Sequence, residues 1–155
     1  MVQLLSPEDN AQISLQTEYE KVFLENSAQY SHPSYKHWRD FYPGAPSRCN
    51  LPVSVTFSWT GNEDTDEFQL SDTEDFFRIL YRTCGCQSYE VTNLQAGKTY
   101  YWRVGDSEVR CFHTAYDLPR FISVDANVGN VRDIGGYQTI YGRRVKQGMI
   151  YRGEE

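Results

Sequence analysis

The sequence predicts a mainly β protein whose larger part is an antiparallel sandwich with a short helical insertion. Aromatic residues are abundant, with 12 Tyr, 8 Phe and 3 Trp, and long runs of helix-forming residues are absent. Short segments of alternating polar and apolar residues recur, with turn-forming residues between them. A chain of 155 residues has room for one full domain and a modest appendage.

The clearest strand is PVSVTFSW, residues 52–59. Its apolar residues alternate and therefore share one face of a sheet: Val53, Val55, Phe57 and Trp59. The acidic loop GNEDTDE follows, and it lacks the glycine and oxygen-ligand spacing of an EF-hand, so we expect a solvated turn. Further strands are expected at short intervals, over residues 68–71, 78–82, 88–94, 99–104 and 108–114.

A short helix is expected from about Glu18 to Asn26. Thr17, with Glu20 three residues later, has the pattern of a capping box. Three residues of the segment share one helical face: Tyr19, Val22 and Phe23. The helix opens an insertion of about residues 16–50.

The rest of this insertion is dense in aromatic residues, and four form a candidate binding surface: Tyr35, Trp38, Phe41 and Tyr42. Such rings could stack on sugars or bases, which would make the protein a carbohydrate-binding module. They could instead cover the open end of the sandwich or contact a neighbouring domain. We favour the second interpretation, because surface aromatic residues more often mark interfaces.

The sharpest local signal in the first part of the chain is NLQAGKTYYWRV. Leu94, Gly97 and Tyr100 have the spacing of a tyrosine corner, in which a Tyr hydroxyl bonds to the backbone of the preceding turn. With Trp59 and Val104, this pattern resembles a fibronectin type III domain. The resemblance implies a fibronectin type III or immunoglobulin-like antiparallel sandwich.

The composition changes at YDLPRF, where Pro119 restricts the residue before it and the alternation ends. We expect the sandwich and its insertion to span residues 1–117, and the start of a second, truncated domain to span residues 118–155. The formal net charge is −6, and residues 118–155 hold six Lys/Arg against four Asp/Glu. The first part therefore carries the negative charge, which disfavours binding to nucleic acid or to an anionic membrane.

The second part contains NVRDIGGY, then GRRVK, then YRG. This order closely resembles the leading segment of the bacterial tyrosine phosphatase family related to dual-specificity phosphatases. The departures are Ile134 in place of Leu and Gly153 in place of Ser. The resemblance implies the first strands of an α/β phosphatase domain, and seven residues carry its motif: Asn130, Arg132, Asp133, Gly135, Gly136, Tyr137 and Arg152.

The residues alone predict less than the resemblance does. The two glycines allow positive φ or close backbone approach, Tyr141 and Gly142 suit a hairpin turn, and Arg132 could pair with Asp133. A hairpin with a solvated basic turn would satisfy this pattern. The resemblance implies that the motif braces a phosphate-binding loop from behind rather than contacting substrate first.

The reaction that the family implies is phosphomonoester hydrolysis through a Cys thiolate. It needs an Arg six positions after the Cys, together with an Asp acid. The positions six after Cys49, Cys84, Cys86 and Cys111 hold Val55, Glu90, Thr92 and Asp117. We therefore expect no catalytic residue in this chain, and a parent protein that carries the missing catalytic domain and acts on a phosphoprotein or a phosphoinositide.

The sequence contains no motif typical of a metal site or of a catalytic triad. His32, His37 and His113 form no ligand pair at helical spacing, and no serine lies in a nucleophile elbow. A zinc site from Cys84 and Cys86 with Cys111 would require neighbouring strands, and we favour reduced structural cysteines instead. We predict no metal and no cofactor.

The remaining expectations concern partners and location. Unpaired strands after Pro119 could pair with a second copy, giving a homodimer through the tail. The N-terminus has no signal-peptide pattern and no segment is long enough to span a membrane, so the default is cytoplasmic, or secreted or cell-surface if a signal was removed. The alternative function is a non-enzymatic sandwich module that binds carbohydrate or protein.

Overall fold

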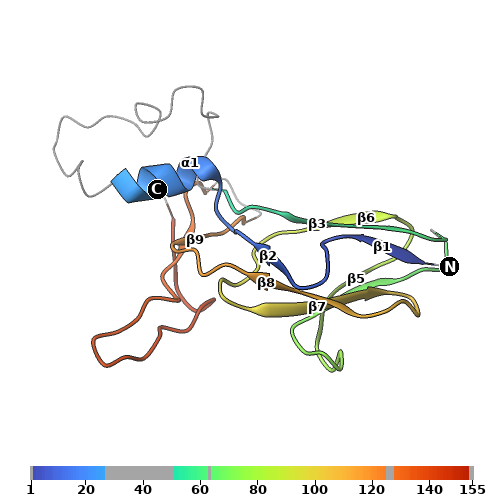
Figure 1. Ribbon diagram of the computed structural model, residues 1–155. Helices are drawn as coiled ribbons and strands as arrows, with labels where there is room; N and C mark the ends of the chain where they lie inside the picture. Colours follow the sequence, from blue (N-terminus) through green and yellow to red (C-terminus); the bar gives the residue numbers. More distant parts are fainter. Residues whose placement is uncertain (1, 27–50, 63, 125–127, 154–155) are drawn as a thin grey trace. The chain divides into compact units, whose positions relative to one another are not determined.

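The computed structural model describes residues 2–26, 51–62, 64–124 and 128–153 (Figure 1). Contacts divide the chain into two compact units. The first consists of Met1–Leu15 and Ser54–Asp117, and the second of Gln16–Val53 and Leu118–Glu155. The four aromatic residues of the candidate binding surface, Tyr35, Trp38, Phe41 and Tyr42, lie outside the described residues.

The first unit is a sandwich of two β-sheets, which Figure 1 shows as two layers. One sheet has the order β1-β3-β6, formed by Gln3–Ser6, Val55–Thr60 and Ser88–Val91. The other has the order β2-β8-β7-β4-β5, formed by Ala11–Ile13, Arg110–Thr114, Thr99–Val104, Phe68–Ser71 and Ile79–Thr83. The prediction of a mainly β protein with antiparallel sheets is confirmed at this level.

One strand pair departs from the expected antiparallel arrangement. Strand β1 runs antiparallel to β3, whereas β2 runs parallel to β8. Only four residues separate β1 from β2, and the chain keeps its direction as it crosses between the sheets (Figure 1). Neither β1 nor β2 was among the strands expected from the sequence, and no local pattern shows that they belong to different sheets.

The core lies between the two sheets and is rich in aromatic rings. Phe57 on β3 is fully buried, and its ring centroid lies 4.9 Å from Phe68, 5.2 Å from Trp102 and 5.6 Å from Phe112. Those three residues lie on strands of the opposite sheet. The alternation predicted over residues 52–59 is confirmed from Val55 to Trp59, where buried residues occupy every second position, but β3 begins at Val55 and Val53 precedes it.

A tyrosine corner closes the sandwich as the sequence predicted. Tyr100, near the start of β7, is buried, and its hydroxyl accepts a hydrogen bond of 2.9 Å from the backbone N–H of Gln95. Gly97 in the same turn has φ of +67°, and a Cβ there would lie 2.4 Å from the ring of Tyr116. The turn therefore needs glycine both for its backbone conformation and for space.

Replacing Tyr100 with phenylalanine should lower the free energy of unfolding of the sandwich by about 1 kcal/mol, because the N–H of Gln95 loses its acceptor. Urea unfolding followed by tryptophan fluorescence would measure the change. Tyr101→Phe is the matched control, since this neighbour lies on the other face of β7 and no hydrogen bond of its hydroxyl is present in the described residues. Equal effects of the two variants would contradict the prediction.

The second unit contains, in its described part, one helix and a small antiparallel sheet. Helix α1 spans Glu18–Asn26, and the sheet has the order β11-β10-β9, formed by Tyr151–Arg152, Arg132–Asp133 and Arg120–Phe121. The capping box is confirmed: Thr17 N–H donates to Glu20 Oε2 at 2.7 Å, and Glu20 N–H donates to Thr17 Oγ1 at 3.2 Å. In the described part of the chain, no helix combines the length and apolar character that crossing a membrane requires.

Contacts group the helix with the second unit, although its place in the sequence suggested an insertion of the sandwich domain. The Gln16 side chain, just before the helix, donates a buried hydrogen bond of 3.1 Å to the carbonyl of Pro119. This contact joins residues 103 positions apart. It is a tertiary contact that no local sequence pattern predicts.

Candidate functional site

The motif NVRDIGGY is organised around a buried carboxylate. Asp133 on β10 is paired in register with Arg120 on β9. Its Oδ2 accepts hydrogen bonds from Arg120 Nε at 3.1 Å and from Nη2 at 2.5 Å, and the two residues are 1% and 4% exposed. A charge at such depth requires a paired and hydrogen-bonded partner, which this geometry provides.

Two backbone groups complete the binding of this carboxylate. Gly135 N–H donates to Oδ1 at 2.8 Å, and Gly148 N–H donates to Oδ2 at 2.7 Å. Asp133 thereby joins β9, β10 and the segment that leads into β11. We call this set the Asp133 network: Asp133, Arg120, Gly135 and Gly148.

The partner of Asp133 corrects one expectation. The sequence suggested an ion pair between Asp133 and its neighbour Arg132, but adjacent residues of a strand point to opposite faces of the sheet. The guanidinium that reaches Asp133 belongs to Arg120, which lies outside the motif and which no sequence pattern singled out. Only the strand register, which brings these residues opposite each other, could have identified it.

The glycines of the motif allow a tight hairpin. A Cβ at Gly135 would lie 2.4 Å from Gln147 Cα and 2.5 Å from the Lys146 carbonyl oxygen, both backbone atoms. Gly136 has φ of +93°, and its N–H donates to the carbonyl of Val145 at 2.8 Å. The expected close approach and positive φ are therefore confirmed. The predicted turn is also present, with Gly142 at φ of +73°.

Arg132 lies beside a second arginine, across the sheet from Asp133. It is paired in register with Arg152 on β11, so their side chains share a face. Arg132 Nε donates to Asn130 Oδ1 at 3.0 Å, and its guanidinium carbon lies 5.4 Å from the ring centroid of Phe121. Asn130, Arg132, Arg152 and Gly153 line a pocket of ≈ 120 Å³, which we call the arginine pocket.

These contacts divide the seven motif residues into three sets. Asn130, Arg132 and Arg152 meet at the arginine pocket; Asp133 and Gly135 belong to the Asp133 network; Gly136 and Tyr137 begin the hairpin. Burial raises the pKa of the Tyr137 hydroxyl, and the charge of Arg132 partly opposes that shift. The phenol is therefore protonated at neutral pH and can donate a hydrogen bond.

A family comparison accounts for this segment. Residues 125–155 match the tyrosine phosphatase family. No curated protein and no solved structure matched the chain. The matched residues, called here the phosphatase segment, include the hairpin, the arginine pocket and three members of the Asp133 network.

The cysteines lie outside the described phosphatase segment. Strands β5 and β8 are separated by β4 and β7, so the neighbouring strands that a zinc site of Cys84, Cys86 and Cys111 required are not present. Within the described residues, no group of three His, Cys, Asp or Glu side chains could hold a metal ion. Burial raises the pKa of the Cys111 thiol, and its Sγ donates to Asn10 Oδ1 at 3.2 Å. A thiol in this state is a poor nucleophile.

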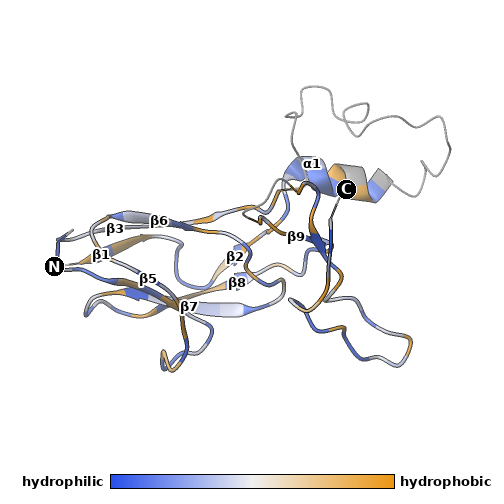
Figure 2. Cartoon of the chain, turned by 180° about the vertical axis from the view of Figure 1, so that it is seen from behind, coloured by the Kyte–Doolittle hydropathy of each residue, from blue (hydrophilic) through white to orange (hydrophobic). Residues whose placement is uncertain are grey.

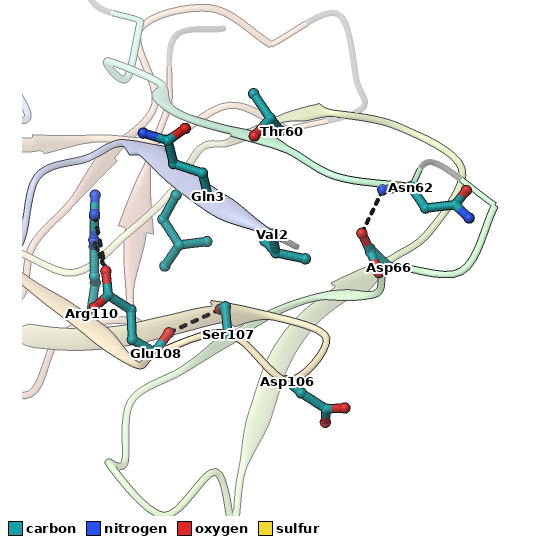
Figure 3. A pocket seen from close by; sticks show the side chains of 10 residues that line it. Val2, Gln3, Thr60, Asn62, Asp66, Asp106, Ser107, Glu108 and Arg110 are labelled. Carbon is teal, nitrogen blue, oxygen red and sulfur yellow. Dashed lines mark hydrogen bonds and ion pairs between the residues drawn. The ribbon is translucent and has the colours of Figure 1, made fainter.

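A wider hollow of ≈ 910 Å³ opens on the sandwich, where β3 ends, β4 begins and β7 turns into β8 (Figure 3). Its lining includes three carboxylates, of Asp66, Asp106 and Glu108. Asp66 Oδ2 accepts from the backbone of Asn62 at 2.6 Å, and Glu108 pairs with Arg110 at 3.0 Å. Two of the three carboxylates thus have partners among the residues that line the hollow. We call the hollow itself the sandwich hollow.

Proposed function

We propose that this chain is the leading part of a tyrosine phosphatase. In this proposal the phosphatase segment contributes the first strands of an α/β catalytic domain, and the sandwich is an accessory domain placed before it. The observation that carries the proposal is the match of residues 125–155 to the tyrosine phosphatase family. The Asp133 network supports it, because these contacts hold the matched segment in one defined arrangement rather than as a loose hairpin.

The parent protein would hydrolyse phosphomonoesters of a protein or an inositol lipid. A Cys thiolate would attack phosphorus, an Arg and backbone N–H groups would hold the phosphoryl oxygens, and an Asp would protonate the leaving group. None of the four cysteines of this sequence has an Arg six positions later. The role proposed for the present residues is therefore to scaffold the phosphate-binding loop of the parent.

The surface of the phosphatase segment supports a larger parent domain. Eight large apolar side chains between residues 134 and 151 are exposed, with Ile140 at 92% and Tyr141 at 84%; Figure 2 shows hydrophobic stretches along this segment. In the described sheet, β9 and β11 are the edge strands. Exposed apolar side chains and unpaired edge strands are usually covered by another segment or by a partner protein. We propose the remainder of the catalytic domain as that covering segment, with a homodimer through the tail as the alternative.

The sandwich supports the fibronectin type III assignment through its topology. Three strands face five, in the orders β1-β3-β6 and β2-β8-β7-β4-β5, and the tyrosine corner is present. In the parent, such a domain would shape access to the catalytic site or recruit a partner. The alternative function, a non-enzymatic binding module, is favoured by the sandwich hollow, because loops at one end of a sandwich commonly bind ligands.

The purified chain should not hydrolyse an aryl phosphate in a thiol-dependent way. The reason is that no cysteine has the required Arg, and the Cys111 thiol has a raised rather than a lowered pKa. Release of p-nitrophenol from p-nitrophenyl phosphate would be compared between the chain and four variants with serine at Cys49, Cys84, Cys86 or Cys111. Turnover that a single one of these substitutions abolishes would contradict the prediction.

The coding sequence after Glu155 tests the parent itself. We expect an open reading frame that encodes His-Cys, five further residues and Arg, because that loop supplies the nucleophile and the phosphate ligands. Expression of this longer protein should give phosphatase activity that depends on its loop cysteine. A stop codon directly after Glu155 would instead favour the binding module.

A further inference from the structure

We propose that the arginine pocket binds a phosphate-type oxyanion, either inorganic phosphate or a phosphomonoester group. This inference does not depend on the proposed phosphatase function, because it follows from the charges and contacts of Asn130, Arg132 and Arg152. The phosphate-binding loop of the parent would be a separate site, which this sequence does not contain.

The charges that line the pocket favour the binding of an anion. Arg132 and Arg152 face each other directly across β10 and β11, and like charges in that position destabilise a sheet. Among the described residues, no carboxylate lines the pocket and neither guanidinium forms an ion pair. Arg120, by contrast, is neutralised by Asp133. An oxyanion between the two guanidinium groups would remove the repulsion.

Arg132 is already held in a position to receive such a ligand. Its Nε is bound to Asn130 Oδ1 at 3.0 Å, and the Phe121 ring lies 5.4 Å from its guanidinium carbon. These contacts leave its two terminal Nη groups as donors. A guanidinium donates pairs of hydrogen bonds that match the oxygen spacing of phosphate. Less side-chain entropy is then lost when the ligand binds.

Arg152 supplies the second positive charge of the pocket, and Gly153 helps to set its shape. Arg152 is exposed, and no contact of its side chain with the described residues holds it away from the pocket. The volume of ≈ 120 Å³ fits one small anion. A Cβ at Gly153 would lie 2.7 Å from Val128 Cγ1, so glycine lets this wall of the pocket pack closely against Val128. Two positive charges match the roughly −1.5 to −2 charge of a phosphomonoester near pH 7.

Titration of the isotope-labelled chain with inorganic phosphate tests the proposal by NMR. At pH 7.5 and constant ionic strength, kept with sodium chloride, the amide signals of Asn130, Arg132, Arg152 and Gly153 should shift and saturate. A second titration with phenyl phosphate separates the two sources of the ligand. Tighter binding of phenyl phosphate would assign the pocket to phosphomonoesters, and tighter binding of phosphate to the free anion.

Variants separate this site from general electrostatic attraction. Arg152→Gln should weaken phosphate binding at least tenfold, whereas Arg143→Gln, which removes the same charge from an exposed position outside the pocket, should change affinity less than twofold. An unchanged amide spectrum outside the pocket would show that Arg152→Gln folds. Absence of saturable shifts, or equal weakening by the two variants, would overturn the proposal.

Discussion

Replacing Asp133 with alanine is expected to destabilise the second unit by about 3–5 kcal/mol, the usual result of removing one partner of a buried ion pair. The substitution leaves the guanidinium of Arg120, which is 4% exposed, without a counter-charge. It also removes the acceptor of the Gly135 and Gly148 N–H groups. Amide hydrogen exchange, read separately for the two units, would measure the loss, with the sandwich as the internal reference.

Two controls distinguish the network from a general effect of substitution. Asp64→Ala removes an exposed carboxylate of the sandwich and should change stability by less than about 0.5 kcal/mol. The double variant Arg120→Met with Asp133→Leu should recover part of the lost stability, because it removes both charges while filling the space, although the Gly135 and Gly148 N–H groups still lack an acceptor. Protection of the second unit that is unchanged in Asp133→Ala would refute the structural role of the network.

Replacing Phe57 with alanine is expected to lower the free energy of unfolding of the sandwich by about 3–5 kcal/mol. The ring is fully buried and contacts Phe68, Trp102 and Phe112 on the opposite sheet. Its loss leaves a cavity where the two sheets meet. Urea unfolding followed by tryptophan fluorescence would measure the change, since Trp102 is one of the contacts.

Phe77→Ala is the matched control for this core substitution, because the same side chain at this position is 90% exposed. It should alter the free energy of unfolding by less than about 0.5 kcal/mol. A similar effect of the two substitutions would mean that the contacts of Phe57 do not hold the sheets together.

Local and periodic features of the sequence were sufficient to predict most elements. The alternation over Val55–Thr60 marks a half-buried strand, and Thr17 with Glu20 marks the start of α1. The tyrosine corner at Tyr100 follows from spacing within one turn. Each feature depends on atoms a few residues apart, so the chain need not be folded for the pattern to be read.

The candidate site was predicted only in part, for the same reason. The motif residues were recognised from their order in the sequence. Positive φ or close backbone approach at the two glycines was predicted because glycine has no Cβ. The division of the motif into a buried network and an arginine pocket was not predicted. That division depends on strand register. Asp133 on β10 lies opposite Arg120 on β9, and Arg132 on β10 lies opposite Arg152 on β11.

The sequence by itself determined the strands between residues 52 and 114, the helix cap, the tyrosine corner and the resemblance of residues 125–155 to the tyrosine phosphatase family. Only the tertiary structure decided that β2 pairs in parallel with β8, that α1 groups with the second unit, and that Arg120 neutralises Asp133. The physical reason is the distance along the sequence over which each interaction acts. Hydrophobic periodicity and capping act within a few residues, whereas pairing depends on which distant segments fold against each other.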